Sequence, residues 1–323
     1  MSRPVFPEWS GDRLVYVSPR AVLNKVGYVT DSQRGQVLPA EAELVASIEA
    51  HVPLQEGEPA AVRHELGTPA EASAQIKALA RELGADMVGI TPIDPKYVYD
   101  GCATEEGFAV VFAIAMDYEG ELLKLPRPET NVEYIRVYEL LSRLGVELAQ
   151  WIRARGYRAR AHSLRDEQLA MLPHAYAAGL GELGKHGSLI NRELGCAFRI
   201  GVVTTELSLA VDSPREDGIQ DFCRSCQMCV SYCPGEAIND EMDVVRGIER
   251  WIVDTERCAP FFSHHFACAV CLQVCPINAK AFGGKFRDAY VQKVRTLDPS
   301  RLAEELAAGV SPPWTEIERN AVP

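Results

Sequence analysis

The sequence has no apolar stretch long enough to cross a membrane as a helix, which takes about 20 apolar residues. Its first residues lack a basic region followed by an apolar one, and they contain no adjacent arginine pair. We therefore expect a cytoplasmic protein without an export signal and without a membrane partner.

Positive charge is also scarce. The chain has 33 lysines and arginines against 45 aspartates and glutamates, which gives a net charge of −12. Proteins that bind nucleic acid usually present a basic surface, so this balance argues against such a partner, although a local basic patch would leave a tRNA substrate open. The hydrophobic content of 47% is typical of a globular protein.

Two nucleotide-binding patterns are missing where they would be expected. No G-x-G-x-x-G follows the first expected strands, and no G-x-x-x-x-G-K-[ST] occurs. The sequence therefore gives no indication of a Rossmann dinucleotide site or of a P-loop ATPase.

Cysteine, in contrast, is concentrated in one stretch. Residues 223–234 read C-x2-C-x2-C-x3-C-P, and residues 268–276 read C-x2-C-x3-C-P. This is the spacing of bacterial ferredoxins that hold two [4Fe–4S] clusters, in which the fourth cysteine of a group binds the other cluster. The predicted ligands are Cys223, Cys226, Cys229 and Cys275 for cluster I, and Cys233, Cys258, Cys268 and Cys271 for cluster II.

Zinc and disulfide bonds are the alternatives for these cysteines. Structural zinc sites use four ligands in two pairs, whereas eight cysteines fall here in two ferredoxin-like groups. Disulfide frameworks belong to oxidising compartments, and this chain shows no export signal. The two remaining cysteines, Cys102 and Cys196, are expected to be small buried apolar residues.

The chain divides into four expected parts. Residues 1–66 form an N-terminal arm, 67–215 a core, 216–285 the cluster module and 286–323 a C-terminal tail. In the core helices and strands alternate, which predicts an α/β (α+β) fold. The expected strands are 87–90, 108–116, 158–162 and 198–205, and the expected helices are 40–51, 69–83, 131–155, 168–178, 242–252 and 299–308, the second with a capping box at Thr68.

Residues 179–187 contain four glycines in nine positions, which rules out a helix interior. Such a loop lets the backbone approach another group closely. We expect the loop to lie against a cofactor or a substrate.

At this point a family resemblance emerges. Residues 173–187 (PHAYAAGLGELGKHG), Gly195 and the strand that contains Arg199 precede the two cysteine groups. In this order they resemble cobalamin-dependent reductive dehalogenases and the related epoxyqueuosine reductases, and the resemblance covers roughly residues 70–285. It is closer to a short cytoplasmic reductive dehalogenase, partly because of Asp221-Phe222 before the first group and Phe261-Phe262 after Cys258.

The resemblance implies a nitroreductase-like core that binds base-off cobalamin, with the clusters reducing its cobalt. No D-x-H-x-x-G occurs, so an axial histidine of that type is not supplied. The implied catalytic residues are Tyr134 or Asp166 as proton donor and Lys185 as the cation that stabilises a departing anion. The residues implied for cofactor binding are Gly179, Gly181, Gly184, His186 and Arg199.

The predicted function is that of an oxidoreductase. Two [4Fe–4S] clusters would deliver electrons to a corrinoid that reductively cleaves a carbon–halogen or carbon–oxygen bond of a small molecule. A low-potential ferredoxin or flavodoxin would supply the electrons. The alternatives are an iron–sulfur flavin reductase and a non-enzymatic electron-transfer or cluster accessory protein.

Overall fold

The structure is a computed structural model, and it describes residues 8–10, 13–15, 38–99, 101–102, 104–118, 128–162, 167–245, 247–264 and 268–278. The C-terminal tail, with its expected helix at 299–308, lies outside the described residues. Near the N-terminus, strands β1 (Glu8–Ser10) and β2 (Arg13–Val15) pair as a short antiparallel hairpin.

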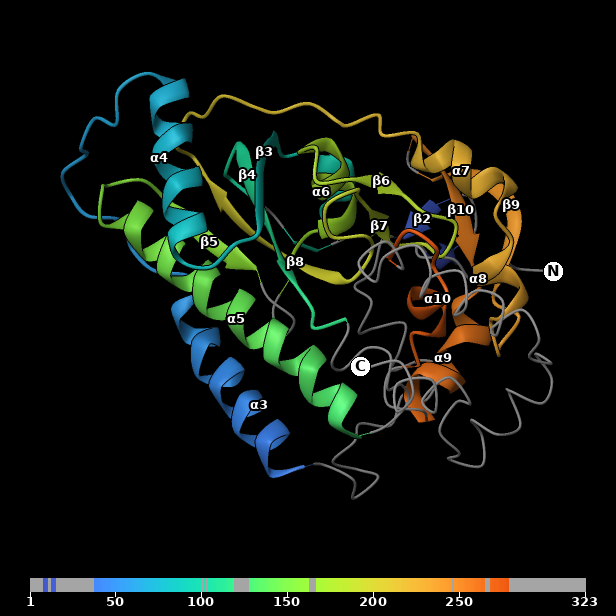
Figure 1. The fold of residues 1–323 in the computed structure, drawn as a ribbon. Coiled ribbons are helices and arrows are strands. Elements are labelled where there is room, and N and C mark those ends of the chain that lie inside the picture. Colours follow the sequence, from blue (N-terminus) through green and yellow to red (C-terminus); the bar gives the residue numbers. More distant parts are fainter. Residues whose placement is uncertain are drawn as a thin grey trace, which may run out of the picture.

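A four-stranded sheet forms the centre of the body (Figure 1). Its order is β3-β4-β8-β5, and each neighbouring pair is antiparallel. The four strands that the sequence predicted are confirmed, while their antiparallel pairing makes this sheet α+β rather than a parallel α/β sheet. The strands are β3 (Met87–Pro92), β4 (Phe108–Ala115), β5 (Ala159–His162) and β8 (Phe198–Thr205).

Alternate residues of the central strand β4 face two different hydrophobic layers, as the two-residue period of a strand requires. Val110 and Phe112 pack with helices α4 (Pro69–Glu82) and α5 (Pro128–Arg153). Ala109 and Val111 pack on the side of the short helix α6 (Met171–Ala177). Both faces of the sheet are therefore covered.

Helix α4 begins as predicted. The Thr68 hydroxyl accepts a hydrogen bond from the Glu71 backbone, and the Glu71 carboxylate accepts one from the Thr68 backbone. This reciprocal pair satisfies two backbone groups that a helix start leaves free.

Part of the expected N-terminal arm packs against the body. Helix α3 (Pro39–His51) lies alongside α5 (Figure 1), and Ser47 donates a hydrogen bond of 3.0 Å to Glu139. After α3 comes the single turn η1 (Val52–Leu54). The buried guanidinium of Arg153 donates to the carbonyl of Leu54 at 3.0 Å and to that of Ala159 at 2.8 Å. Residues 39–55 are thereby fastened to the end of α5.

The cysteine-rich part consists of short helices and one hairpin. The prediction of a helix at 242–252 is wrong, because β9 (Ile238–Val245) and β10 (Ile248–Val253) form an antiparallel hairpin. Gly247, at φ +89°, lies in its turn, and isoleucine or valine occupies three positions in each strand. The helices are α7 (Ile219–Ser225), α8 (Met228–Ser231), α9 (Thr255–His264) and α10 (Val270–Gln273).

One hydrophobic cluster joins the sheet to the cysteine-rich part. It includes Phe112 and Leu144 of the body together with Trp251, Cys229 and Cys275. Two further pieces complete the fold, the turn η2 (Pro95–Tyr97) and the small hairpin of β6 (Glu182–Leu183) and β7 (Leu189–Ile190). Among the described helices, none combines the length and the apolar character that a membrane crossing requires.

Candidate cluster and cofactor site

The eight predicted cluster cysteines lie in the interior or half-buried near it, on α7, α8, α9, α10 and the segments beside them. Burial raises the pKa of the Cys223 thiol to about 11 and that of Cys268 to about 12. A thiol with such a pKa stays protonated unless a bound cation takes its place. Eight cysteine thiols in one region are a donor set that fits iron–sulfur clusters.

The electrostatic neighbours of these thiols fall mainly into two sets, and besides burial Cys229 of the first set also raises the pKa of Cys271 in the second. Besides burial, Cys275, Cys226 and Cys223 raise the pKa of Cys229. In the second set, besides burial, Cys258 and Cys233 raise the pKa of Cys268. The two sets have the composition expected from the spacing, and the assignment of four ligands to each cluster stays a prediction.

The glycine-rich loop approaches the chain's own atoms. A Cβ atom on Gly179 would lie 2.5 Å from the Ser213 carbonyl oxygen, and one on Gly181 would lie 2.5 Å from that of Ile190. One on Gly184 would lie 2.5 Å from the Ile190 side chain. The spacing Gly179-x-Gly181-x-x-Gly184 matches the letters of the dinucleotide pattern, but the loop joins α6 to β6, the reverse of the strand-to-helix context of such sites. Contact of these glycines with a cofactor stays a prediction.

Lys185, at the tip of the β6–β7 hairpin, is 1% exposed. Its ammonium forms an ion pair with Asp240 of β9 and lies 5.9 Å from the ring of Trp251 of β10. Its backbone N–H donates to Cys223, which opposes the effect of burial on the pKa of that thiol. The partners of Lys185 in the described part of the chain thus belong to the cysteine-rich region, and its role as a catalytic cation stays a prediction.

Tyr134 and Arg199 meet inside the protein. Tyr134, on α5, is 2% exposed, and the guanidinium carbon of Arg199 lies 4.8 Å from its ring centre. The Tyr134 hydroxyl and the Arg199 Nε atom are both buried without a hydrogen-bond partner among the described residues. Burial raises the pKa of Tyr134; Arg199 opposes this rise, and Cys268 and Cys271 add to it. The pair therefore lies near thiols predicted for cluster II.

The third catalytic candidate, Asp166, lies outside the described residues. The following residue, Glu167, escaped the sequence analysis, and burial raises the pKa of its carboxyl to about 7. A carboxyl that keeps its proton near neutral pH can serve as a general acid. In the sequence, the one feature that pointed to Glu167 was its position next to Asp166.

Glu182 holds the start of α7. Its carboxylate accepts hydrogen bonds from the backbone N–H groups of Gly218 at 3.0 Å and Gln220 at 2.9 Å. A negative charge at a helix start is favourable, and α7 carries Cys223. The glycine-rich loop thus positions a predicted cluster ligand.

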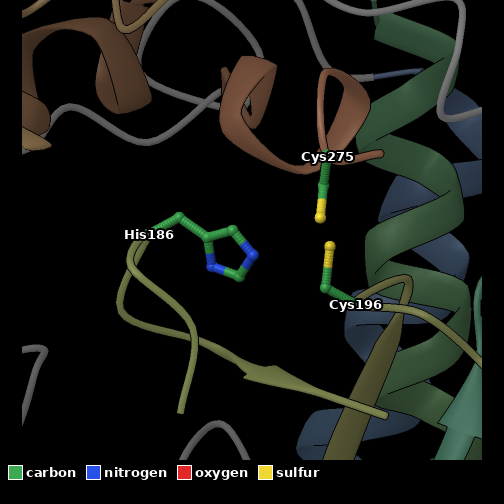
Figure 2. A group of neighbouring side chains, drawn as sticks. All are labelled: His186, Cys196 and Cys275. Carbon is green, nitrogen blue, oxygen red and sulfur yellow. The ribbon is translucent and has the colours of Figure 1, made fainter. Parts of the chain in front are cut away.

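His186, also in the predicted cofactor set, lies next to Cys275 and Cys196 (Figure 2). The hydrogen bond that Cys196 donates, together with the nearby His186 ring, holds the pKa of the Cys275 thiol well below its ordinary value. Cys196 is buried, as expected, but no sequence signal indicated that it lies beside a thiol 79 positions away. This trio is taken up below.

Comparison with known families bears on the cysteines first. Residues 222–279 match the family model described as "4Fe-4S dicluster domain". The match includes all eight predicted ligands. The prediction of two [4Fe–4S] clusters is confirmed.

Two groups of curated relatives were found. The tetrachloroethene reductive dehalogenase of Dehalobacter restrictus is 31% identical over 268 residues, which cover 64% of this chain and 48% of the relative. The epoxyqueuosine reductase of Leadbetterella byssophila is 34% identical over 114 residues, 33% of this chain and 36% of the relative. The chain resembles reductive dehalogenases. Both groups are reductases, so the predicted resemblance is confirmed, and the chain spans about half the length of the dehalogenases it matches.

Solved structures support the fold. The catabolic reductive dehalogenase NpRdhA, solved in complex with 3-bromo-4-hydroxybenzoic acid, superimposes with a TM-score of 0.72 at 27% identity, covering 90% of this chain and 44% of that one. A reductive dehalogenase whose structure suggests a mechanism for B12-dependent dehalogenation gives 0.68 at 29% identity, covering 82% and 40%. The reductive dehalogenase fold is shared, and the description of the core as nitroreductase-like is not tested.

Proposed function

We propose that this protein is an iron–sulfur reductase that works with a corrinoid and reductively cleaves a carbon–halogen bond. The observation that carries this proposal is the Tyr134–Arg199 pair. It has unsatisfied buried polar atoms among the described residues, and besides burial Cys268 and Cys271, two predicted ligands of cluster II, raise the pKa of Tyr134. The proposal also draws support from the likeness to a reductive dehalogenase structure that suggests a mechanism for B12-dependent dehalogenation and to one solved in complex with 3-bromo-4-hydroxybenzoic acid.

The residues fit a polar cofactor at this place. A buried hydroxyl or guanidinium N–H without a partner costs about 1–3 kcal/mol, so native proteins rarely keep one unless a ligand or water satisfies it. A corrinoid carries amide groups that can accept such hydrogen bonds, and when bound it supplies a low-potential metal centre for reductive cleavage. Tyr134 and Arg199 would hold it, together with the predicted contacts of the glycine-rich loop.

Tyr134 then acts as the proton donor. Its raised pKa keeps the phenol protonated, and the proton can pass to a substrate carbon that has become carbanion-like. Arg199 beside the ring stabilises the phenolate that remains. Asp166 is the alternative donor, and Lys185, given its partners, contributes its positive charge at cluster I.

The halogenated substrate class is preferred over the carbon–oxygen class. The dehalogenase matches extend over 64–75% of this chain, whereas the epoxyqueuosine reductase matches extend over 33–44%. A small-molecule substrate also suits the acidic charge of the chain better than a tRNA does. A low-potential ferredoxin or flavodoxin is proposed as the electron donor.

Anaerobic expression with excess hydroxocobalamin, followed by metal analysis, tests the proposal. We expect about eight irons and one cobalt per chain, with turnover of aryl halides but not of epoxides under a low-potential reductant. Eight irons without cobalt would contradict it. A yellow chromophore released on unfolding would then favour the flavin reductase, and cluster absorbance alone the accessory protein.

A further inference from the structure

Three side chains gather where no spacing predicted a group. One ring nitrogen of His186 and the sulfur atoms of Cys196 and Cys275 all lie within 4.8 Å of one another in the interior (Figure 2). His186 comes from the tip of the β6–β7 hairpin, Cys196 from the turn before β8, and Cys275 from the segment after α10. Cys275 is a predicted ligand of cluster I, whereas neither cluster accounts for the other two.

Cys196 is held against Cys275 by its backbone. The Cys196 N–H donates to the Asn278 side-chain oxygen at 2.6 Å, and the Asn278 amide donates to the Leu272 carbonyl at 2.8 Å. Gly195, at φ +62°, makes room for this contact, because a Cβ atom there would lie 2.1 Å from the same Asn278 oxygen. The Cys196 sulfur lies within 4.8 Å of the Cys275 sulfur, and it also lies 3.9 Å from the Leu272 carbonyl oxygen.

His186 presents a single N–H group to the same sulfur. Its Nδ1 atom accepts a hydrogen bond from the Ser188 backbone at 3.2 Å, so the proton of the neutral ring is on Nε2. Nε2 is buried and has no hydrogen-bond partner in the described part of the chain, although a ring nitrogen of His186 lies within 4.8 Å of both sulfur atoms. Figure 2 shows this far edge of the ring turned toward the two sulfur atoms. The absence of a side chain at Gly184 leaves room for the ring, since a Cβ atom there would lie 3.1 Å from His186 Cε1.

We propose that His186 and Cys196 are positioning residues that donate hydrogen bonds to the Cys275 thiolate and raise the reduction potential of cluster I. Reduction adds negative charge that the cluster shares with its thiolate sulfurs. N–H and S–H donors therefore stabilise the reduced state more than the oxidised one. The hairpin that carries His186 also directs the Lys185 N–H at Cys223, so it supplies donors to two of the four predicted ligands.

The test is a redox titration in which electron paramagnetic resonance monitors each cluster. It uses anaerobic full-length protein that has been reconstituted with iron and sulfide but not with a corrinoid. We expect H186L to shift one of the two clusters by about tenfold in its reduction equilibrium, which is about 59 mV for one electron, toward lower potential. C196A shifts the same cluster in the same direction. H186Q restores most of the potential, because its amide N–H replaces Nε2–H.

His174 provides the matched control. It is a buried histidine whose Nδ1 bonds the Ala170 carbonyl at 2.7 Å and whose Nε2 accepts from the Asp94 backbone at 3.4 Å. H174Q is expected to leave both cluster potentials unchanged.

Wild-type potentials in both H186L and C196A would overturn the proposal, and so would an equal shift in H186L and H186Q, since packing rather than the N–H would then matter. If H186L binds less iron, the potentials of H186Q and C196A decide. The proposal rests on Cys275 as a ligand of cluster I, which C275A tests separately, because a full complement of iron in that variant refutes the assignment. A missing corrinoid would affect none of these readouts.

Discussion

The guanidinium carbon of Arg199 lies 4.8 Å from the centre of the Tyr134 ring, and both side chains retain a buried polar atom without a partner among the described residues. One residue belongs to the long helix and the other to the sheet strand that pairs with β4. Their meeting places next to each other two buried polar atoms that have no partner in the described part of the chain.

This pair of polar atoms predicts opposite effects of Y134F on stability and on turnover. Removing a buried hydroxyl that lacks a partner should stabilise the corrinoid-free protein by about 1 kcal/mol. Loss of the proton donor should slow turnover at least about 100-fold without changing the iron content. Denaturant unfolding and steady-state kinetics measure the two effects. Y138F is the control, since Tyr138 lies 5.7 Å from the same guanidinium; a destabilised Y134F would mean that the hydroxyl has a partner.

The ion pair of Lys185 and Asp240 predicts an asymmetry between its two halves. D240N leaves a buried ammonium without its carboxylate and should cost about 2 kcal/mol, less than the loss of a fully buried pair because Asp240 is 57% exposed. K185M replaces the ammonium with an apolar group of similar length and should cost less. Unfolding in urea gives both values, and equal costs would show that the buried charge carries no such penalty.

Glu167 predicts a dependence of stability on pH. Burial raises its pKa from 4.5 to about 7, so the folded protein binds this proton more tightly than the unfolded chain does. Its contribution is therefore present at low pH and is lost as the pH rises from about 4.5 to 7. E167Q should unfold like the wild type at pH 4 and be more stable at pH 8, by up to about 3 kcal/mol. E193Q, at a carboxyl whose pKa the hydrogen bond from Arg215 lowers, should show no such gain.

Cys258 is the predicted ligand outside both cysteine groups, and burial and its neighbour Cys233 both raise the pKa of its thiol. C258S should therefore lower the iron content from about eight to about four per chain and remove one of the two cluster signals. C102S, outside the predicted ligand sets, should keep about eight. Iron analysis and electron paramagnetic resonance decide, and eight irons in C258S would exclude it as a required ligand.

Most helices and strands could be predicted from patterns among residues close together in the sequence. The capping box at Thr68 and the apolar runs of β4 and β8 depend only on residues near in sequence, so their helix and strands could be predicted. The parallel or antiparallel pairing of strands depends on how the chain returns, which alternation of elements does not determine. The β9–β10 hairpin was taken for a helix because valines and isoleucines around Trp251 allow either period over a short stretch.

The site divides in the same way. The two clusters could be predicted because the cysteine spacing is local and repeated, and residues 222–279 match a family model. The neighbours of Cys275 could not, since His186 and Cys196 reach it through tertiary packing. The partners of Lys185 were missed for the same reason, because Asp240 and Trp251 belong to a hairpin that the sequence did not reveal.

The hydrophobic cluster that unites the sheet with Trp251, Cys229 and Cys275 has a consequence for the life of the protein in a cell. Metal binding free energy is folding free energy when the ligands belong to the interior. A chain made during iron shortage would thus lose stability in the sheet as well as in the cysteine-rich part. It would therefore be more often unfolded and open to proteases. The abundance of this protein would then follow the iron supply without any dedicated sensor.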